Sequence, residues 1–485
     1  MHASSTEGAD HPAPIGTLAR LVRRPAPALG PGASLREALV ALDRHGSEAV
    51  AVIDPGTQAP LGILTLRDVI RRVVLGAAAL DLPVATVMTG GVVSIAADAT
   101  SHRASVTMIR RNVRHLVLVA ADGRYCGIVS QADLYGMPAV RSAEIVDAIA
   151  GAPDIAALAV VAAEVRAYTS TLLDEGLTAA ALSQQISALN DLIGLRAIDL
   201  VSAEHDLPYV PWCWMVFGSE GRLEQTLSTD QDNGLVFVAE SDEEAACLRE
   251  LFLPFARAVN AALDACGFPL CKGNVMAGNP ELCLSASEWK DKFSNWIRVA
   301  EPQAVVNATI FFDLRALFGD EQLVTELQGT IMALVADHPE FLRSLTQASL
   351  DWHSPLGWVS GFRYDGNKEF PHTIDLKASG IRPFVDGARI WSLAKGFAGT
   401  NTSDRLRATG PLLHFRAEET AAFIGAFDQL QRLRFANQLQ ARVPEAANRV
   451  DPDQLNELDR QILRESLKRV KRLQQLLEVE FLRTS

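Results

Sequence analysis

The segment over residues 212–238 constrains the fold of this chain more than any other. An apolar run at 212–217 stops at Gly218 and Ser219, a polar segment follows, and Asp230 and Asp232 lead into a second apolar run at 234–238. This order predicts a strand, a loop with a helix, and a second strand. Because side chains on an extended chain repeat every second residue, both carboxylates should leave the same face.

Two carboxylates in that arrangement repel each other and favour a bound cation. Mg²⁺ prefers oxygen ligands and usually takes one or two carboxylates together with the phosphates of a substrate. Gly218 lets the backbone approach a ligand closely, and Ser219 can offer its hydroxyl and N–H at a helix start, where the dipole favours an anion. A lone Gly-Ser is usually a turn and a lone Asp-x-Asp a solvated strand end, but their combination indicates a site for a metal-bound nucleoside triphosphate.

The longer motif reads Gly-Ser-Glu-Gly-Arg-Leu-Glu-Gln at 218–225 and Thr-Asp-Gln-Asp-Asn at 229–233. It resembles the nucleotidyltransferase superfamily typified by DNA polymerase β, and within it the branch similar to the N-terminal domain of the PII-protein uridylyltransferase. The resemblance implies a mixed sheet with helices and two Mg²⁺ ions. It also implies transfer of a nucleoside monophosphate from UTP or ATP to a hydroxyl acceptor.

A third carboxylate is typical of this superfamily. We expect Asp313, in the apolar run at 308–315, to lie on a third strand and to act with Asp230 and Asp232 as a catalytic residue and metal ligand. A strand-terminal Asp313 paired with Arg315 is the alternative, and Asp375 is the rival for the third carboxylate.

The same resemblance implies that Arg222 helps Gly218 and Ser219 to hold the β and γ phosphates. The alternative for Arg222 is a surface ion pair with Glu224. The sequence assigns no role to Glu224 or Gln225, although both belong to the motif.

Residues 15–138 contain an internal repeat, with copies at 15–75 and 83–138. Each copy predicts a helix, a strand and a turn, with the strands at 49–53 and 115–119 and the second helix at 101–111. Each copy ends in Gly, two apolar residues, Thr or Ser, two residues and Asp, which resembles a tandem pair of CBS domains. That α+β pair often binds an adenine nucleotide, here at Thr65, Asp68, Ser130 and Asp133, because a hydroxyl can hold phosphate and a carboxylate can accept from ribose. Alternatively, the two hydroxyl residues end strands, the two aspartates cap helices, and the pair serves only packing or dimerisation.

With 485 residues, the chain is too long for one ordinary core, and its class is α/β and α multi-domain. We expect a disordered tail at 1–14, a helical connector at 139–207 and a nucleotidyltransferase core at 208–345. Residues 346–485 should form a C-terminal helical bundle that binds substrate, since 380–389 and 402–407 resemble the corresponding region of the same family.

Composition narrows the partners and the compartment. A net charge of −13 argues against a protein that binds nucleic-acid backbones. The six cysteines are scattered and no secretory start precedes them, which indicates free thiols in a reducing cytoplasm. Cys266, Cys271 and Cys283 lack the spacing of a zinc site and are expected to be buried thiols. No stretch approaches the roughly 18 apolar residues of a membrane span.

The sequence therefore predicts a cytoplasmic, Mg²⁺-dependent nucleotidyltransferase that is homodimeric through its CBS pair. Its acceptor hydroxyl would lie on a PII-like signalling protein, and adenine nucleotides bound to the CBS pair would regulate it through the connector. Two alternatives stay open. The first is a non-catalytic nucleotide-sensing regulatory protein, which the intact acidic pair disfavours, and the second is a small-molecule nucleotidyltransferase.

Overall fold

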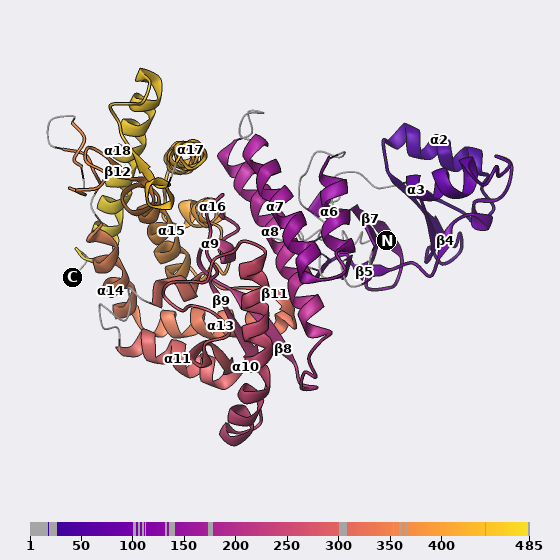
Figure 1. Ribbon diagram of the computed structural model, residues 1–485, viewed down its shortest axis with the longest axis horizontal. Coiled ribbons are helices and arrows are strands. Elements are labelled where there is room, and N and C mark those ends of the chain that lie inside the picture. The colour runs from indigo at the N-terminus through magenta and orange to yellow at the C-terminus, as the bar shows by residue number, and fades with distance from the viewer. Residues whose placement is uncertain are drawn as a thin grey trace, which may run out of the picture. The chain divides into compact units, whose positions relative to one another are not determined.

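The computed structural model describes residues 18, 27–99, 103–104, 107–108, 111, 113–130, 133–134, 141–172, 178–299, 308–352, 354–357, 361–364, 366–441 and 443–483 (Figure 1). The chain divides into two compact units between Glu144 and Ile145. The tail expected at 1–14 lies outside the described residues, as does most of the helix expected at 101–111.

The first unit repeats one strand arrangement. In each copy a short strand runs parallel to a longer one, which pairs antiparallel with a third. Alternate side chains from both copies, including Ala51, Ile63, Val117 and Ile128, meet in a shared apolar cluster. The strands are β1 (Ala28–Leu29), β2 (Ala49–Ile53), β3 (Pro60–Thr65) and β4 (Thr89–Gly90), then β5 (Ser94–Ala96), β6 (His115–Val119) and β7 (Tyr125–Ser130). The predicted repeat is thus confirmed.

Short helices flank these strands. Ser34 and Glu37 form a reciprocal capping box at the first of them, which fixes where the helix begins. The helices are α2 (Leu35–His45), α3 (Leu66–Asp68), η1 (Val69–Val74) and η2 (Val84–Thr86).

The second unit is built on a mixed four-stranded sheet with the order β10-β9-β8-β11. The strands are β8 (Trp212–Val216), β9 (Asn233–Phe237), β10 (Cys283–Ser285) and β11 (Arg315–Gly319). β9 and β11 run antiparallel to β8, and β10 runs parallel to β9. This arrangement confirms the mixed sheet that the motif predicts.

Alternation along β8 directs its side chains to two helical layers. Met215 and the following Phe217 pack with α11 (Ala286–Val299) and α13 (Glu321–Asp337), whereas Trp212 and Trp214 contact aromatic rings of α10 (Asp242–Ala265). Helices therefore cover both faces of the sheet (Figure 1).

Three helices precede the sheet in the segment expected to be a connector: α6 (Arg141–Gly151), α7 (Ile155–Leu172) and α8 (Ala179–Ser202). α8 packs against α7, α10, β11 and the C-terminal helix α17 (Ala417–Gln440). Its side chains are buried along most of its length, so α8 is part of the core of the second unit.

The C-terminal helices surround α15 (Arg382–Ala394), in which every side chain from Pro383 to Leu393 is buried. Its neighbours are α14 (Pro339–Leu350), α16 (Thr402–Leu412) and α18 (Glu457–Phe481). Shorter elements are α9 (Gly218–Gly221), η3 (Pro280–Leu282), η4 (Thr309–Phe312), β12 (Ile374–Asp375), η5 (Lys377–Ile381), η6 (Pro444–Ala446) and β13 (Arg449–Val450). One apolar cluster runs from the sheet into these helices, which confirms the predicted α/β and α class.

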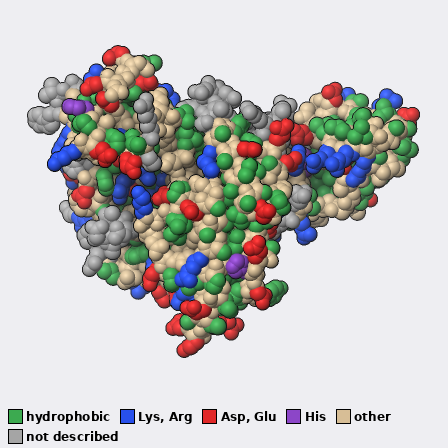
Figure 2. Space-filling view, viewed as in Figure 1, with side chains coloured by type: hydrophobic (Ala, Val, Ile, Leu, Met, Phe, Trp, Pro, Cys, Tyr) green, Lys and Arg blue, Asp and Glu red, His purple; other side chains and the backbone are tan. Residues whose placement is uncertain are grey.

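Acidic and basic side chains are interspersed over the face seen in Figure 2. Within the described part of the chain, every helix is too short or too polar to cross a lipid bilayer.

Candidate functional site

The β8–β9 pair brings the glycine bend and the acidic residues together. Phe217 N–H donates to the carbonyl of Asp232 over 2.8 Å. Gly218 has φ +57°, and a Cβ placed there would lie 2.9 Å from Cγ1 of Ile310 and 3.3 Å from Oδ2 of Asp232. A side chain at 218 would therefore be strained and would crowd the carboxylate, so glycine suits this position.

Asp230 and Asp232 lie beside Cys271, with one potential ligand atom from each residue within 4.8 Å of the others. Burial raises the pKa of Asp232 to about 7, and the charge of Asp230 adds to the shift. Such a rise is expected for paired carboxylates without a cation. The carboxylate oxygens suit a divalent ion, and the sulfur of Cys271 is a further potential ligand atom.

Of the three cysteines expected to be buried thiols, two are buried. Cys266 and Cys283 are buried free thiols, whereas Cys271 is partly exposed and sits at the acidic pair. Spacing alone could not find this contact, because residues 271 and 232 meet only through the fold.

A cavity of about 350 Å³ opens beside the acidic pair. One wall comes from the motif and carries Gly218, Ser219, Asp230 and Asp232. The other part of the lining comes from the C-terminal part of the chain and carries Asp375 of β12, Lys377 of η5, and Gln431 and Arg434 of α17. The sequence analysis missed the last three, since nothing in their local spacing links them to the motif.

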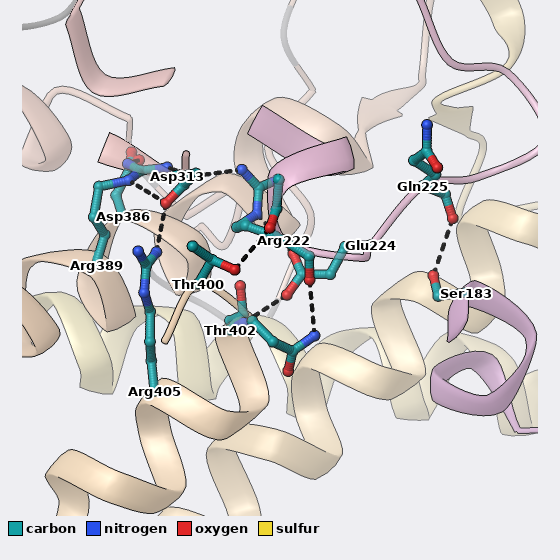
Figure 3. Close-up of polar contacts among 12 residues, drawn as sticks. Ser183, Arg222, Glu224, Gln225, Asp313, Asp386, Arg389, Thr400, Thr402 and Arg405 are labelled. Atoms are coloured by element: carbon teal, nitrogen blue, oxygen red, sulfur yellow. Dashed lines mark hydrogen bonds and ion pairs between the residues drawn. The ribbon is translucent and has the colours of Figure 1, made fainter. Parts of the chain in front are cut away.

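Asp313 does not lie with the acidic pair. The strand expected at 308–315 begins only at Arg315, and Asp313 occupies the turn between η4 and β11. Its fully buried carboxylate accepts hydrogen bonds from Arg222, Arg389 and Arg405 at 2.5–3.1 Å (Figure 3). Burial would raise the pKa of Asp313, but the three arginines outweigh it and hold the pKa well below its ordinary value.

Two alternatives were considered for Asp313: an ion pair with Arg315, and Asp375 as the third carboxylate in its place. Arg315 pairs with Asp191 of α8 at 2.8 Å instead of with Asp313. The rival residue, Asp375, lines the cavity, and its Oδ1 accepts from the N–H of Ala378 over 3.0 Å.

Arg222 lines the cavity, and its guanidinium group is hydrogen-bonded to two protein carboxylates. Its Nε donates to Glu224 at 2.8 Å and its Nη1 to Asp313 at 2.6 Å. The ion pair with Glu224 weighed above therefore exists, but Glu224 is buried and Arg222 only partly exposed, so it is not a surface pair.

The structure gives Glu224 and Gln225 roles that the sequence did not. Glu224 Oε1 accepts from the N–H of Thr402 over 2.6 Å, at the start of α16. Gln225 is held by α8, because its N–H donates to Ser187 and its amide oxygen accepts from Asn190. These motif residues join the loop before Asp230 to helices on two sides.

In the first unit, Thr65 and Asp68 bond to each other, as do Ser130 and Asp133. The hydroxyls donate to the carboxylates at 2.7 and 2.6 Å, and the aspartate N–H groups donate back to the hydroxyl oxygens. This is the reciprocal helix-capping geometry that was the alternative to nucleotide binding.

Comparison with protein families assigns the parts of the chain. The family described as "Putative nucleotidyltransferase DUF294" matches residues 163–303, which contain the bend and the acidic pair. The family described as "Putative nucleotidyltransferase substrate binding domain" matches residues 339–481, and the CBS domain family matches residues 18–75 and 84–137. No curated protein matches the chain.

Solved structures of CBS-domain proteins also match. A CBS domain protein from Pyrobaculum aerophilum complexed with AMP is 23% identical, and the match covers 27% of this chain and 98% of that one at a TM-score of 0.23. A CBS-domain containing protein from Agrobacterium tumefaciens is 32% identical, with 24% and 94% covered and a TM-score of 0.22. On these family matches, the chain combines a pair of CBS domains with a nucleotidyltransferase domain of the DUF294 family and the substrate-binding domain that the second family describes.

Proposed function

We propose that the chain transfers a nucleoside monophosphate from UTP or ATP to a hydroxyl acceptor in the cavity beside Asp230 and Asp232, with Mg²⁺ as the cofactor. The acceptor oxygen forms a bond to the α-phosphorus, the bond between the α-phosphorus and the bridging oxygen of the β-phosphate breaks, pyrophosphate leaves, and the hydroxyl proton passes to solvent. The observation that carries this proposal is the contact between Gly218 and Asp232, because it sets a close-approach backbone next to paired carboxylates. A nucleoside triphosphate with its metal complements both features.

In this proposal Asp230 and Asp232 hold the metal ions. When bound, the metal neutralises phosphate oxygens and lowers the pKa of the attacking hydroxyl. Gly218 and Ser219 orient the phosphates nearest the metal, and Arg222 contributes positive charge from the cavity wall. Asp313 acts through Arg222 rather than on the metal, because both of its oxygens already accept from arginines.

We further propose a hydroxyl on a PII-like signalling protein as the acceptor, and adenine nucleotides as regulators bound at the CBS pair. The polar contacts of α8 with Gln225 support such regulation, since a shift of α8 would reach the loop before Asp230. A cytoplasmic location and a homodimer formed through the CBS pair complete the proposal and rest on the sequence alone.

The test incubates the purified chain with Mg²⁺ and each α-labelled nucleoside triphosphate, alone, with a purified PII protein, and with cell lysate. Label on a protein supports the proposal. Label on a small molecule would indicate the small-molecule transferase instead, and no label with any donor would favour the nucleotide sensor.

Asp230→Asn and Asp232→Asn should each abolish the transfer, whereas Asp291→Asn, a change of an exposed aspartate on α11, should not. Activity that survives in both site variants would refute the assignment of the acidic pair.

A further inference from the structure

The cavity wall formed by the C-terminal part of the chain carries two cations, Lys377 and Arg434, that make no ion pair with a described carboxylate. Arg434 is 6% exposed, and its Nε donates to the neutral side chain of Asn448 over 2.6 Å. Lys377 reaches the same cavity from η5. Among the described residues, neither side chain has a carboxylate oxygen within 4.0 Å.

The neighbouring arginines show what usually happens to a buried cation here. Arg389 and Arg405 are as buried as Arg434, yet both make ion pairs with Asp313 of 2.6 and 2.5 Å. Removing a cation from water is costly unless an anion compensates for it. Burial lowers the pKa of Arg434 to about 10, and the charge of Asp375 opposes this shift without forming an ion pair with the guanidinium. Its environment therefore suits a ligand that brings negative charge.

A second polar group on this wall is the side-chain oxygen of Gln431, which accepts no hydrogen bond from the described residues. Gln431 lies one turn before Arg434 on α17, is 4% exposed and lines the cavity. Its Oε1 is buried and accepts no hydrogen bond in the described structure. Buried polar atoms are almost always paired, so this oxygen indicates a donor that arrives with a ligand.

Lys377 connects this wall with the metal site electrostatically. Loss of water and repulsion from Arg434 lower the pKa of Lys377, whereas attraction to Asp230 and Asp232 opposes that shift. An anion held by Lys377 and Arg434 would thus lie close to a metal bound at the acidic pair.

We propose that Lys377 and Arg434 bind the terminal phosphate of the donor triphosphate and that Gln431 accepts a hydrogen bond from a hydroxyl or N–H of the same nucleotide. The identification of the ligand as a nucleoside triphosphate rests on the proposed function. That the ligand carries negative charge is inferred from the cavity alone. The C-terminal helical domain would then hold the donor nucleotide as well as the acceptor.

The test measures binding of inorganic tripolyphosphate by calorimetry in metal-free buffer, with full-length wild type and variants. Lys377→Gln and Arg434→Gln should each weaken binding about tenfold or more, because each removes a charge-assisted contact to phosphate. Lys468→Gln, which removes an exposed lysine on α18, should leave the affinity unchanged. Arg434→Lys should recover part of it.

Because Arg434 is buried, circular dichroism should establish that its variants fold, and Lys377→Gln carries the test if they do not. Equal affinity in wild type and Lys377→Gln would overturn the phosphate assignment, as would tight binding by a folded Arg434→Gln.

Gln431→Leu separates the second part of the proposal from the first. This change should leave tripolyphosphate binding unaltered but weaken binding of a non-hydrolysable nucleoside triphosphate with Mg²⁺. An unchanged nucleotide affinity would remove Gln431 from the site.

The tripolyphosphate measurement tests the anion site separately from the transfer reaction. If wild type transfers no nucleotide but tripolyphosphate binding still depends on Lys377 and Arg434, the anion site stands and the proposed function fails. If wild type transfers nucleotides while Lys377→Gln and folded Arg434→Gln bind tripolyphosphate normally, the proposed function stands and this inference fails.

Discussion

Arg222 donates a hydrogen bond of 2.6 Å to Asp313, so two side chains expected to face the substrate are paired with each other. Arg389 of α15 and Arg405 of α16 complete the pairing from the C-terminal helices (Figure 3). Asp313 therefore links the nucleotidyltransferase core to the substrate-binding domain, and its charge sets the position of Arg222 on the cavity wall.

Asp313→Asn should lower the free energy of unfolding by about 3–5 kcal/mol, because it leaves buried guanidinium groups without their anion. Urea unfolding followed by circular dichroism measures this change. Asp230→Asn is the matched control, since it removes an exposed carboxylate that repels Asp232 and should not destabilise the fold.

The opposite pattern would restore Asp313 as a metal ligand. In that case Asp313→Asn would weaken Mg²⁺ binding as much as Asp230→Asn does, with little loss of stability.

Asp313 also shows where inference from the sequence ends. The motif over 212–238 fixed its own local geometry, because strand periodicity and a glycine bend act over a few residues. The partners of Asp313 come from positions 222, 389 and 405, and no local pattern indicates that these meet. An apolar run containing one aspartate reads equally well as a strand with a functional carboxylate or as a turn with a structural one.

The same limit applies to the cavity. The repeat strands over 49–53 and 115–119 were predictable to the residue from their apolar runs. Lys377, Gln431 and Arg434 were not, because their relation to the acidic pair depends on how α17 and η5 pack. Within the described residues, Gln431 stands out by a buried oxygen that accepts no hydrogen bond, Arg434 by burial without an ion pair, and Lys377 by its place on the cavity wall. All three are properties of the folded chain.

Stability should depend on pH through Asp232. Its pKa of about 7 in the fold exceeds the value of about 3.9 expected in the unfolded chain, so between these values the folded state binds more protons. The stabilising contribution of the protonated side chain is therefore complete at low pH and is lost as the pH rises through about 7.

Thermal unfolding of the metal-free protein between about pH 5 and 8 measures this dependence. Asp232→Asn should remove that part of the pH dependence. Mg²⁺ should raise the unfolding temperature of wild type more at pH 8 than at pH 5, because the ion competes with the proton for the carboxylate. Equal stabilisation by Mg²⁺ at both pH values would contradict a metal site at Asp232.

Gly218→Ala should destabilise the fold by about 1–3 kcal/mol and weaken Mg²⁺ binding. The residue has φ +57°, and the added methyl group would crowd Ile310 and the carboxylate of Asp232. Gly329→Ala is the control, because Gly329 lies inside α13 with nothing within 4 Å of the added atom. That change should stabilise the helix slightly. Similar effects of the two changes would show that the bend at 218 has no special conformation.

The hydrogen bonds between α8 and Gln225 allow the proposed regulation to be tested. Ser187 is fully buried and its hydroxyl accepts from the N–H of Gln225 over 3.1 Å, so Ser187→Ala leaves that N–H unpaired at a cost of about 1–3 kcal/mol. Ser202→Ala on the same helix is the matched control, because its hydroxyl donates within α8, to the carbonyl of Ile198.

If α8 couples the CBS pair to the cavity, Ser187→Ala should reduce the change in transferase rate that adenine nucleotides cause, whereas Ser202→Ala should preserve it. Transferase assays over a range of AMP and ATP concentrations compare the two variants with wild type. The basal rate distinguishes the two roles of the contact. A lower basal rate with an unchanged response to nucleotide means that Ser187 only holds the loop before Asp230. A smaller response in Ser187→Ala than in Ser202→Ala requires the contact to differ between the two regulatory states, which is the condition for coupling between distant sites.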